Sequence, residues 1–510
     1  MKYRPNRCLT RWVCLLCVCL ALGGCASVEN GASVQVTLGP AVQKRTAPAA
    51  DTSQEYQQTV MLYLPSRDGS RLIATPQRAT LYADSPAAWQ LAPLLLNHPG
   101  TDAAGPVGGG VALRLADESP VEVSGQVATV NLAASALRLS AEQLFTVGQA
   151  LANTLCQFGD LQYVNLLIAG AQPGLNVAAT LPAGCFQPNS RDDLNALWAR
   201  ASAPLTQGRR AFTAALYFPA PSGKGILCEP RTLTFASADV PAMAQTLLEA
   251  LSAGAAMLPH IPSCPDFRSL LRETPTVSEE GGEKRLVLRF REEMNGELIN
   301  AGITRSVMMG AFTYTFTTFL PGIAGIEVRI GDERITSLTP SGTYARAGET
   351  IAFEEGVMRR RDFSGFLLTE CTLYLTDYTG LLIPVSRPVP YQEAFSARAL
   401  VGQLLQGSQP FDSRTGLSGV LPEGLLETDL LGVGFEDHVL LLNFSRRLVR
   451  LSRDSGWGDE EKLVYSLVNT LCCLPGVKRV ALFIEGEQPE TLSGVLYLPG
   501  DFLPNRDLVE

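Results

Sequence analysis

Three short motifs in this 510-residue sequence have spacings close to those of catalytic or nucleotide-binding sites. The run Gly416-Leu417-Ser418-Gly419 approaches the G-x-S-x-G elbow that presents a nucleophilic serine, but it lacks the final glycine. Gly100 and Gly105 have the spacing of a phosphate-binding loop, but Pro106 stands where that loop carries lysine. Gly432-Val433-Gly434 lies before a predicted strand, so it does not form a dinucleotide fingerprint. The sequence therefore predicts no catalytic residue, no cofactor-binding residue and no enzyme.

Metal coordination has little support either. The chain has three histidines, His98, His260 and His438. Each falls beside a loop or a strand start, without a carboxylate at a spacing that would indicate a pair. They are interpreted as ordinary surface residues. The sequence thus predicts no metal site.

Seven cysteines follow residue 25, and no two of them have the C-x-x-C spacing typical of zinc sites. Disulfides are allowed outside the cytoplasm, and Cys228 with Cys264 is one bridge that the spacing permits. Spacing alone leaves the connectivity open. Cys156 and Cys472 each follow a leucine of a predicted helical stripe, which favours small buried hydrophobic side chains.

Four asparagines are the most conspicuous polar residues in the apolar elements. Asn153 and Asn469 lie two positions after a helix leucine, and Asn131 and Asn443 lie within predicted strands. Most side-chain hydrogen bonds are made to the backbone or to water. Each asparagine is therefore interpreted as bonding a neighbouring backbone group rather than a ligand.

Charge argues against nucleic acid as a partner. The net charge is −9, and the first 24 residues carry four basic residues and no acidic one, so the remaining chain is at −13. Binding to nucleic acid depends on neutralising phosphates. The run Arg359-Arg360-Arg361 is interpreted as a solvated loop. Asp459-Glu460-Glu461 is interpreted as a helix start, where acidic side chains complement the dipole.

The elements that position these residues recur along the chain. Residues 142–170 and 461–486 each predict an amphipathic helix, a tight turn and a short alternating strand, and residues 308–330 form a less regular copy. Each helix carries an apolar stripe at steps of four, four and three: Val147, Leu151, Leu155 and Phe158; Met308, Phe312, Phe316 and Phe319; Leu463, Leu467, Leu471 and Leu474. The third residues of the three stripes, Leu155, Phe316 and Leu471, lie about 155–160 residues apart. This spacing is typical of a repeated whole domain rather than of the short repeats of a solenoid.

The sequence thus predicts an α+β fold with three tandem repeats, each packing two helices on one face of a three- or four-stranded sheet. The predicted boundaries are residues 59–182, 210–337 and 363–490. Residues 491–510 are predicted to form a C-terminal extension with a further apolar strand at Val495–Leu498.

The N-terminus has the pattern of a targeting signal. A basic stretch precedes the apolar run Trp12–Leu22, which is too short for a permanent membrane span. The following Leu22-Gly23-Gly24-Cys25 resembles a bacterial lipobox. That resemblance implies cleavage after residue 24, diacylglycerol on the Cys25 sulfur and a fatty acyl chain such as palmitate on its amine. Residues 25–58 are predicted to form a flexible tether.

Several short motifs together resemble the GerMN domain of sporulation and spore-germination lipoproteins. The first repeat carries Leu62–Pro65, Val127–Leu132 and Asn153-Thr154-Leu155. The third carries Leu442-Asn443-Phe444 and Asn469-Thr470-Leu471. The middle one follows the same order of elements, with Tyr314-Thr315-Phe316 in place of Asn-Thr-Leu. Members of this family usually carry two copies, so a third departs from the pattern.

The resemblance implies a fold related to ring-building motifs and a non-enzymatic scaffold anchored by its N-terminal lipid. The expected location is the extracytoplasmic face of the cell membrane in an endospore-forming bacterium, including the space between mother cell and forespore. The expected partners are proteins of a sporulation or germination assembly. Two alternatives remain open: a solute- or cell-wall-binding lipoprotein with the same anchor, and an envelope hydrolase.

Overall fold

The computed structural model describes residues 45–159, 161–175, 181–189, 192–203, 209–454 and 459–510. The predicted signal peptide, Cys25 and most of the predicted tether lie outside these residues. Contacts divide the chain into Met1–Arg45 and Thr46–Glu510, and every described helix and strand belongs to the second unit. No helix within the described ranges combines the length and apolarity that crossing a bilayer requires.

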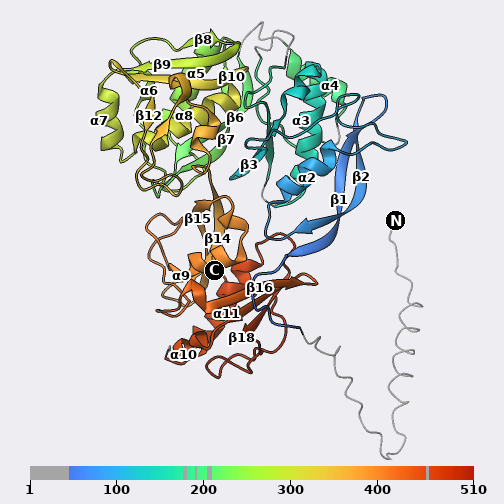
Figure 1. Cartoon of the computed structure of the whole chain (residues 1–510), viewed down its shortest axis with the longest axis vertical. Helices are drawn as coiled ribbons and strands as arrows, with labels where there is room; N and C mark the ends of the chain where they lie inside the picture. The colour runs from blue at the N-terminus through green and yellow to red at the C-terminus, as the bar shows by residue number, and fades with distance from the viewer. Residues whose placement is uncertain (1–44, 160, 176–180, 190–191, 204–208, 455–458) are drawn as a thin grey trace, which may run out of the picture. The chain divides into compact units, whose positions relative to one another are not determined.

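The second unit has the predicted α+β class (Figure 1). One order of elements occurs in a first segment (Glu55–Ile168), a middle segment (Arg210–Ile330) and a third segment (Leu368–Ile484). This order is a hairpin, a helix, an antiparallel pair of strands, a long helix and a final strand. The final strand pairs in parallel with the second strand of the antiparallel pair. The first segment has β1 (Glu55–Pro65), β2 (Leu72–Tyr82), α2 (Ala87–Leu96), β3 (Val121–Ser124), β4 (Val127–Leu132), η1 (Ala134–Arg138), α3 (Ala141–Leu155) and β5 (Tyr163–Ile168), with α4 (Leu194–Ser202) after it.

The middle and third segments add the remaining elements. The middle one has β6 (Arg210–Pro219), β7 (Ile226–Phe235), α5 (Val240–Ser252), α6 (Phe267–Leu270), β8 (Thr276–Glu280), β9 (Glu283–Phe290), α7 (Glu293–Asn300), α8 (Arg305–Phe319) and β10 (Ile323–Ile330). Between it and the third lie β11 (Glu333–Arg334), β12 (Ser337–Leu338), β13 (Ile351–Ala352), η2 (Glu354–Gly356) and η3 (Arg360–Phe363). The third has β14 (Leu368–Thr376), β15 (Leu382–Pro390), η4 (Glu393–Phe395), α9 (Ala397–Leu405), η5 (Glu427–Asp429), β16 (Leu430–Glu436), β17 (Val439–Phe444), α10 (Arg446–Asp454), α11 (Asp459–Leu471) and β18 (Arg479–Ile484).

The strands of each segment form two sheets, which differs from the single sheet predicted. The hairpins β1–β2, β6–β7 and β14–β15 stand as two-stranded sheets. The sheets β3-β4-β5, β16-β17-β18 and β8-β9-β10-β11 hold the rest. The long helix of the first segment, α3, contacts both β1 and β5, so one apolar face serves two sheets. Periodicity shows that a strand has a buried face, but it does not show which strand lies beside it.

The apolar stripes form the core as predicted, except that Phe158 lies beyond the end of α3 and is only partly buried. Leu151, Phe312 and Leu467, the second residues of the three stripes, are fully buried. Helix α3 begins with a capping box between Ser140 and Gln143. Helix α8 is helical despite its threonines and aromatic residues because burial along almost its whole length outweighs helix propensity.

A short stretch of chain crosses the parallel strand of each segment at the same register position. The bridges are Val164 with Phe186, Ile326 with Met358 and Val480 with Phe502, and all are antiparallel. The register supports the equivalence, because these residues of β5, β10 and β18 pair with Ala128, Leu286 and Leu440. We call residues Phe186–Asn189, Met358–Arg361 and Phe502–Asn505 the first, middle and third straps. Each strap lies beyond the predicted boundary of its repeat.

The C-terminal extension contains no strand at Val495–Leu498, contrary to prediction. Val495 is 44% exposed, and the backbone N–H groups of Leu492 and Val495 donate to the Glu460 carboxylate at 2.7 and 2.9 Å. Glu460 is buried, so it holds the extension against α11 rather than simply complementing the helix dipole. The apolar run Val495–Leu498 was therefore not a strand signal here.

The described end of the predicted tether lies against the third segment. The Thr52 N–H donates to the Val433 carbonyl at 2.9 Å, and the Val433 N–H donates to the Asp51 carboxylate at 2.9 Å. A Cβ at Gly432 would come within 2.6 Å of the Pro48 carbonyl oxygen. The Gly432-Val433-Gly434 run thus has a packing role, because side chains there would block the approach of residues 48–52.

Candidate functional site

A threonine in the long helix of each segment makes the same contact with the hairpin. The hydroxyls of Thr154, Thr315 and Thr470 accept the backbone N–H groups of Tyr63, Tyr217 and Tyr374 at 3.1, 3.0 and 3.1 Å. In each case the N–H belongs to the hairpin strand that precedes the helix in sequence. All three threonines are fully buried, so the hydroxyl satisfies a donor that water does not reach.

The asparagine before this threonine locks the strap in the first and third segments. The Asn153 side chain accepts the Asn189 N–H at 2.7 Å and donates to its carbonyl at 3.1 Å. Asn469 makes the same two bonds with Asn505, at 3.0 and 3.1 Å. Both helix asparagines are buried. They bond backbone as predicted, but the partner lies 36 residues away rather than in the neighbouring turn.

The middle segment replaces this lock with an aromatic and charged one. Tyr314 stands at the asparagine position, and the guanidinium of Arg360, in the middle strap, lies 4.0 Å from the centre of its ring. The Tyr314 hydroxyl donates to the Glu122 carboxylate of β3 at 2.9 Å. Arg360 forms an ion pair with the same carboxylate and donates to Thr318 at 2.5 Å. The contact between helix and strap is thus kept, and it gains a partner in the first segment.

This contact corrects the interpretation of Arg359-Arg360-Arg361 as a solvated loop. Arg360 is only 5% exposed, and Arg359 pairs with Glu283 at 2.6 Å. Burial by itself would lower the pKa of the Arg360 guanidinium, but the charge of Glu122 raises the pKa above its ordinary value. Arg361 alone of the three is well exposed.

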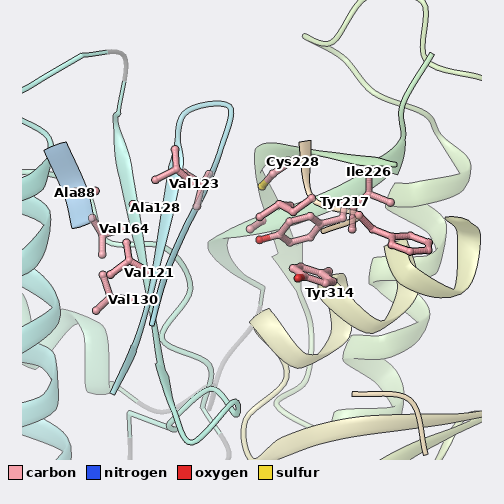
Figure 2. Close-up of a cluster of buried hydrophobic side chains, with 14 of the residues drawn as sticks. Ala88, Val121, Val123, Ala128, Val130, Val164, Tyr217, Ile226, Cys228 and Tyr314 are labelled. Atoms are coloured by element: carbon pink, nitrogen blue, oxygen red, sulfur yellow. The ribbon is translucent and has the colours of Figure 1, made fainter. Parts of the chain in front are cut away.

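Strand β3 is where the three segments meet, and Ser124 connects them directly. Its hydroxyl donates to the Leu368 carbonyl of β14 at 2.5 Å and accepts the Cys228 N–H of β7 at 3.0 Å. Figure 2 shows Val121 and Val123 of β3 on one side and Tyr217, Cys228 and Tyr314 across from them. We call Glu122 and Ser124, with their partners Tyr314, Arg360, Cys228 and Leu368, the junction.

The strand asparagines bond the turns that follow the parallel strands β5 and β18. Asn131 and Asn443 accept the N–H groups of Gly170 and Gly486, both at 3.0 Å. The Asn131 amide donates to the Glu118 carbonyl at 3.0 Å, and the Asn443 amide donates to the Pro48 carbonyl at 2.9 Å. They bond backbone, as predicted.

The histidines do not come together. Each ring bonds a different stretch of backbone through one nitrogen: His98 bonds Gly100, His260 bonds Ser413, and His438 bonds Gly476. Across the described ranges, no three His, Cys, Asp or Glu side chains are placed to hold a metal ion.

The cysteines are free thiols at all seven described positions, so the Cys228–Cys264 bridge is not formed. Burial raises the pKa of Cys156, Cys185, Cys371 and Cys472 to about 12. A thiol with so high a pKa is a poor nucleophile near neutral pH. Ser418, of the incomplete serine motif, forms a backbone bridge with Thr376.

A cleft of about 720 Å³ lies between the first and third segments. Its walls include the first residues of β1 and β14, the turn after α3 and the turn after α11. Aromatic side chains of Tyr56, Phe158 and Phe395 line it, together with Glu370 and Lys478 as charged groups. Its volume is within the range of about 300–1,000 Å³ found for ligand sites.

Sequence reasoning missed the straps and the cleft. The straps had a readable signal, because Phe186-Gln187-Pro188-Asn189 and Phe502-Leu503-Pro504-Asn505 share an F-x-P-N pattern. The middle strap lacks this pattern, so only the register of its bridge reveals it. The cleft had no signal, since its walls lie far apart in the sequence.

Comparison with protein families finds a match in the third segment. Residues 372–490 match the Germane family, described as sporulation and spore germination. A search of curated proteins found no match. The chain therefore carries a GerM-like domain in its third segment.

Two solved structures from Bacillus subtilis are similar to this chain. The tandem GerMN domains of the sporulation protein GerM share 16% identity, cover 58% of this chain and 99% of their own, and have a TM-score of 0.22. The first GerMN domain of that protein shares 23% identity, covers 27% of this chain and 99% of its own, and has a TM-score of 0.22.

Proposed function

We propose that this chain, which carries a Germane domain at residues 372–490, is a lipid-anchored extracytoplasmic scaffold for a sporulation or germination assembly. Its first, middle and third segments are tandem GerMN-like repeats, and the middle one has diverged. The recurring threonine contact and the three bridged straps support this reading. The family is not known for enzymatic activity, and the protein acts by binding.

The junction is the observation that carries the scaffold proposal. Glu122 and Ser124 of one short strand contact both other segments through side chains that are 13% exposed or less. Buried polar groups that pair across segments favour one arrangement of those segments over others. A body of three fixed repeats presents several surfaces in constant relative positions, which is what assembling partners requires.

The anchor is the second part of the proposal. The lipobox-like run ends at Cys25, and 20 residues separate Cys25 from Thr46, where the compact unit begins. Residues 48–52, near the start of the compact unit, contact the third segment, which carries the Germane domain. Two lipid signals on one cysteine give stable membrane attachment.

Fractionation of sporulating cells tests the anchor. The wild-type chain is expected in the membrane fraction, with a lipidated N-terminal peptide in mass spectrometry. Cys25→Ala should release the chain, whereas the matched control Cys19→Ala should not. Unchanged membrane attachment of Cys25→Ala would contradict the lipid anchor.

A deletion strain tests the process. Loss of the gene should reduce the yield of spores or their germination, and the wild-type copy should restore it. Tagged protein should also retain other membrane proteins of the sporulating cell after crosslinking. Normal spores from the deletion strain would count against a role in either stage.

A solute- or cell-wall-binding lipoprotein is the second candidate, and the cleft favours it. Aromatic rings such as Tyr56 and Phe395 suit sugar rings and apolar solutes. Calorimetric titration with muropeptides would support this candidate if heat of binding appeared and disappeared on substitution of these rings.

A further inference from the structure

We propose that the cleft between β1 and β14 binds an extended polypeptide segment of a partner protein, which pairs with the free edges of these two strands. This inference rests on the scaffold function proposed above and names the chemistry of its partner. It is carried by unpaired backbone groups at the cleft wall rather than by the cleft's volume.

The outward-facing residues of β1 follow from its pairing. In an antiparallel pair, the N–H and C=O of alternate residues point toward the partner strand and away from it. The Gln54 carbonyl accepts from Ala83, on the β2 side. The N–H groups of Met61 and Tyr63 instead bond side chains of the α3 region. The register has no irregularity between Glu55 and Pro65, so Gln57 and Thr59 also point away from β2.

The same alternation holds in β14. The Leu368 carbonyl and the Tyr374 N–H bond Ser124 and Thr470, on the side away from β15. The register is regular from Leu368 to Thr376, so Glu370 and Thr372 point to that side as well.

These four outward-facing residues line the cleft. They are Gln57, Thr59, Glu370 and Thr372. Among the described residues, none provides a hydrogen-bond partner for their backbone groups. An uncovered strand edge with free N–H and C=O groups is a template for another strand. Both walls of the cleft therefore offer N–H and C=O groups at the spacing of a strand, which the backbone of an extended polypeptide matches.

A comparison of the two strands explains why the edge of β14 is open. In the first segment, the Gln157 amide covers the backbone of Met61, accepting its N–H at 2.9 Å and donating to its carbonyl at 2.8 Å. The equivalent residue in the third segment is Cys473, three positions after the threonine in both helices. Its thiol donates to the Asn469 carbonyl of its own helix at 3.3 Å. The equivalent backbone, at Thr372, is left for the cleft.

The side chains of the cleft define the kind of segment that fits. Aromatic rings at Tyr56, Phe158 and Phe395 suit apolar side chains at alternate positions of the bound strand. Glu370 and Lys478 give the lining one charge of each sign, so a segment with little net charge is favoured. The partner is therefore an extended, apolar, nearly neutral peptide segment.

The test begins with selection of random linear peptides, displayed on phage, on the full-length protein in detergent. A selected peptide is then titrated against variants. Thr59→Pro and Thr372→Pro each remove one outward N–H, and proline is tolerated at the free edge of a strand. Each should weaken binding about tenfold, in line with one lost hydrogen bond. The matched variants Thr59→Ala and Thr372→Ala keep the N–H and should bind as wild type does.

Amide hydrogen exchange provides the structural signature. The bound peptide should slow exchange at Gln57, Thr59, Glu370 and Thr372, while the β1–β2 ladder stays unchanged. Failure to select any peptide, unchanged affinity in both proline variants, or protection elsewhere would overturn the inference. Binding of muropeptides at the cleft without slowed exchange at these amides would overturn it in favour of a cell-wall ligand.

Failure of the peptide-binding proposal can be distinguished from failure of the proposed scaffold function. A strain carrying both proline substitutions that forms normal spores, with the chain in the membrane fraction, would reject peptide binding as part of the role but leave the scaffold intact. Normal spores from the deletion strain would reject the sporulation role and leave the peptide titration untouched.

Discussion

The third and middle segments hold their strap against the long helix with different side chains. In the third, Asn469 of the long helix bonds the backbone of Asn505 in the third strap, and these bonds involve neither of the other segments. In the middle, Tyr314 packs against Arg360, and both reach Glu122 of the first segment. The middle segment thus makes the contact between helix and strap through different partners. Where it has Tyr314-Thr315-Phe316 instead of Asn-Thr-Leu, it also contacts the first segment.

The largest effect is expected where the segments are alike. Leu151→Asp, Phe312→Asp and Leu467→Asp each place an unpaired charge in the same fully buried stripe. Each should lower the free energy of unfolding by about 3–5 kcal/mol in denaturant titrations. Leu137→Asp, at a side chain that is 67% exposed, is the control and should have little effect. Wild-type stability in one of the three would show that its helix does not pack like the others.

Tyr314→Phe sharpens the contrast between the segments. It removes the hydrogen bond to Glu122 and should cost about 1.5–3 kcal/mol, because one partner is charged. Tyr391→Phe is the matched control, since the buried Tyr391 hydroxyl has no hydrogen-bond partner among the described residues. Equal stability of the two variants would remove Tyr314 from the junction.

The threonine contact tests the opposite point, that the segments share an internal bond. Thr154→Val, Thr315→Val and Thr470→Val should each cost about 1–3 kcal/mol by leaving a tyrosine N–H unpaired. Thr313→Val should be nearly neutral, since that hydroxyl donates only to a carbonyl of its own helix. A cost confined to one segment would break the equivalence.

The smallest effect concerns the contact between Asp51 and the third segment. The hydrogen bond from Arg398 lowers the Asp51 pKa, and the Val433 N–H adds to this. A lowered pKa contributes stability that is present above the usual value near 3.8 and is lost as the pH falls below it. The half-exposed pair is worth about 0.2–1 kcal/mol. Asp51→Asn should flatten that part of the acid unfolding curve, and an unchanged curve would contradict the contact.

The sequence predicted the helices, their stripes and the central strands because burial of one face leaves a period that can be read directly. The Val127–Leu132 motif of the first predicted repeat has the same bounds as β4 in the structure. The junction could not be predicted. Arg360 lies in a run of three arginines, and the carboxylate that allows its burial lies 238 residues away. Periodicity carries no information on such distant pairs.

The free edges of β1 and β14 escaped prediction for a related reason. The alternation of side chains along a strand shows which face of the strand is buried. It does not show whether the backbone N–H and C=O groups at either edge are paired. Whether an edge is covered depends on residues such as Gln157 and Cys473, which belong to other elements. The anchor at Cys25 remains a prediction from sequence, since it lies outside the described residues.

Calorimetric unfolding of the full-length protein and its Arg360→Met variant tests most directly whether the three segments form one body. The wild type should unfold in a single cooperative transition. Arg360→Met leaves Glu122 without its ion pair, so it should cost about 3–5 kcal/mol and separate the transition into at least two. Independent transitions already present in the wild type, and unmoved by Arg360→Met, would show that the segments fold as separate units and that the junction does not join them.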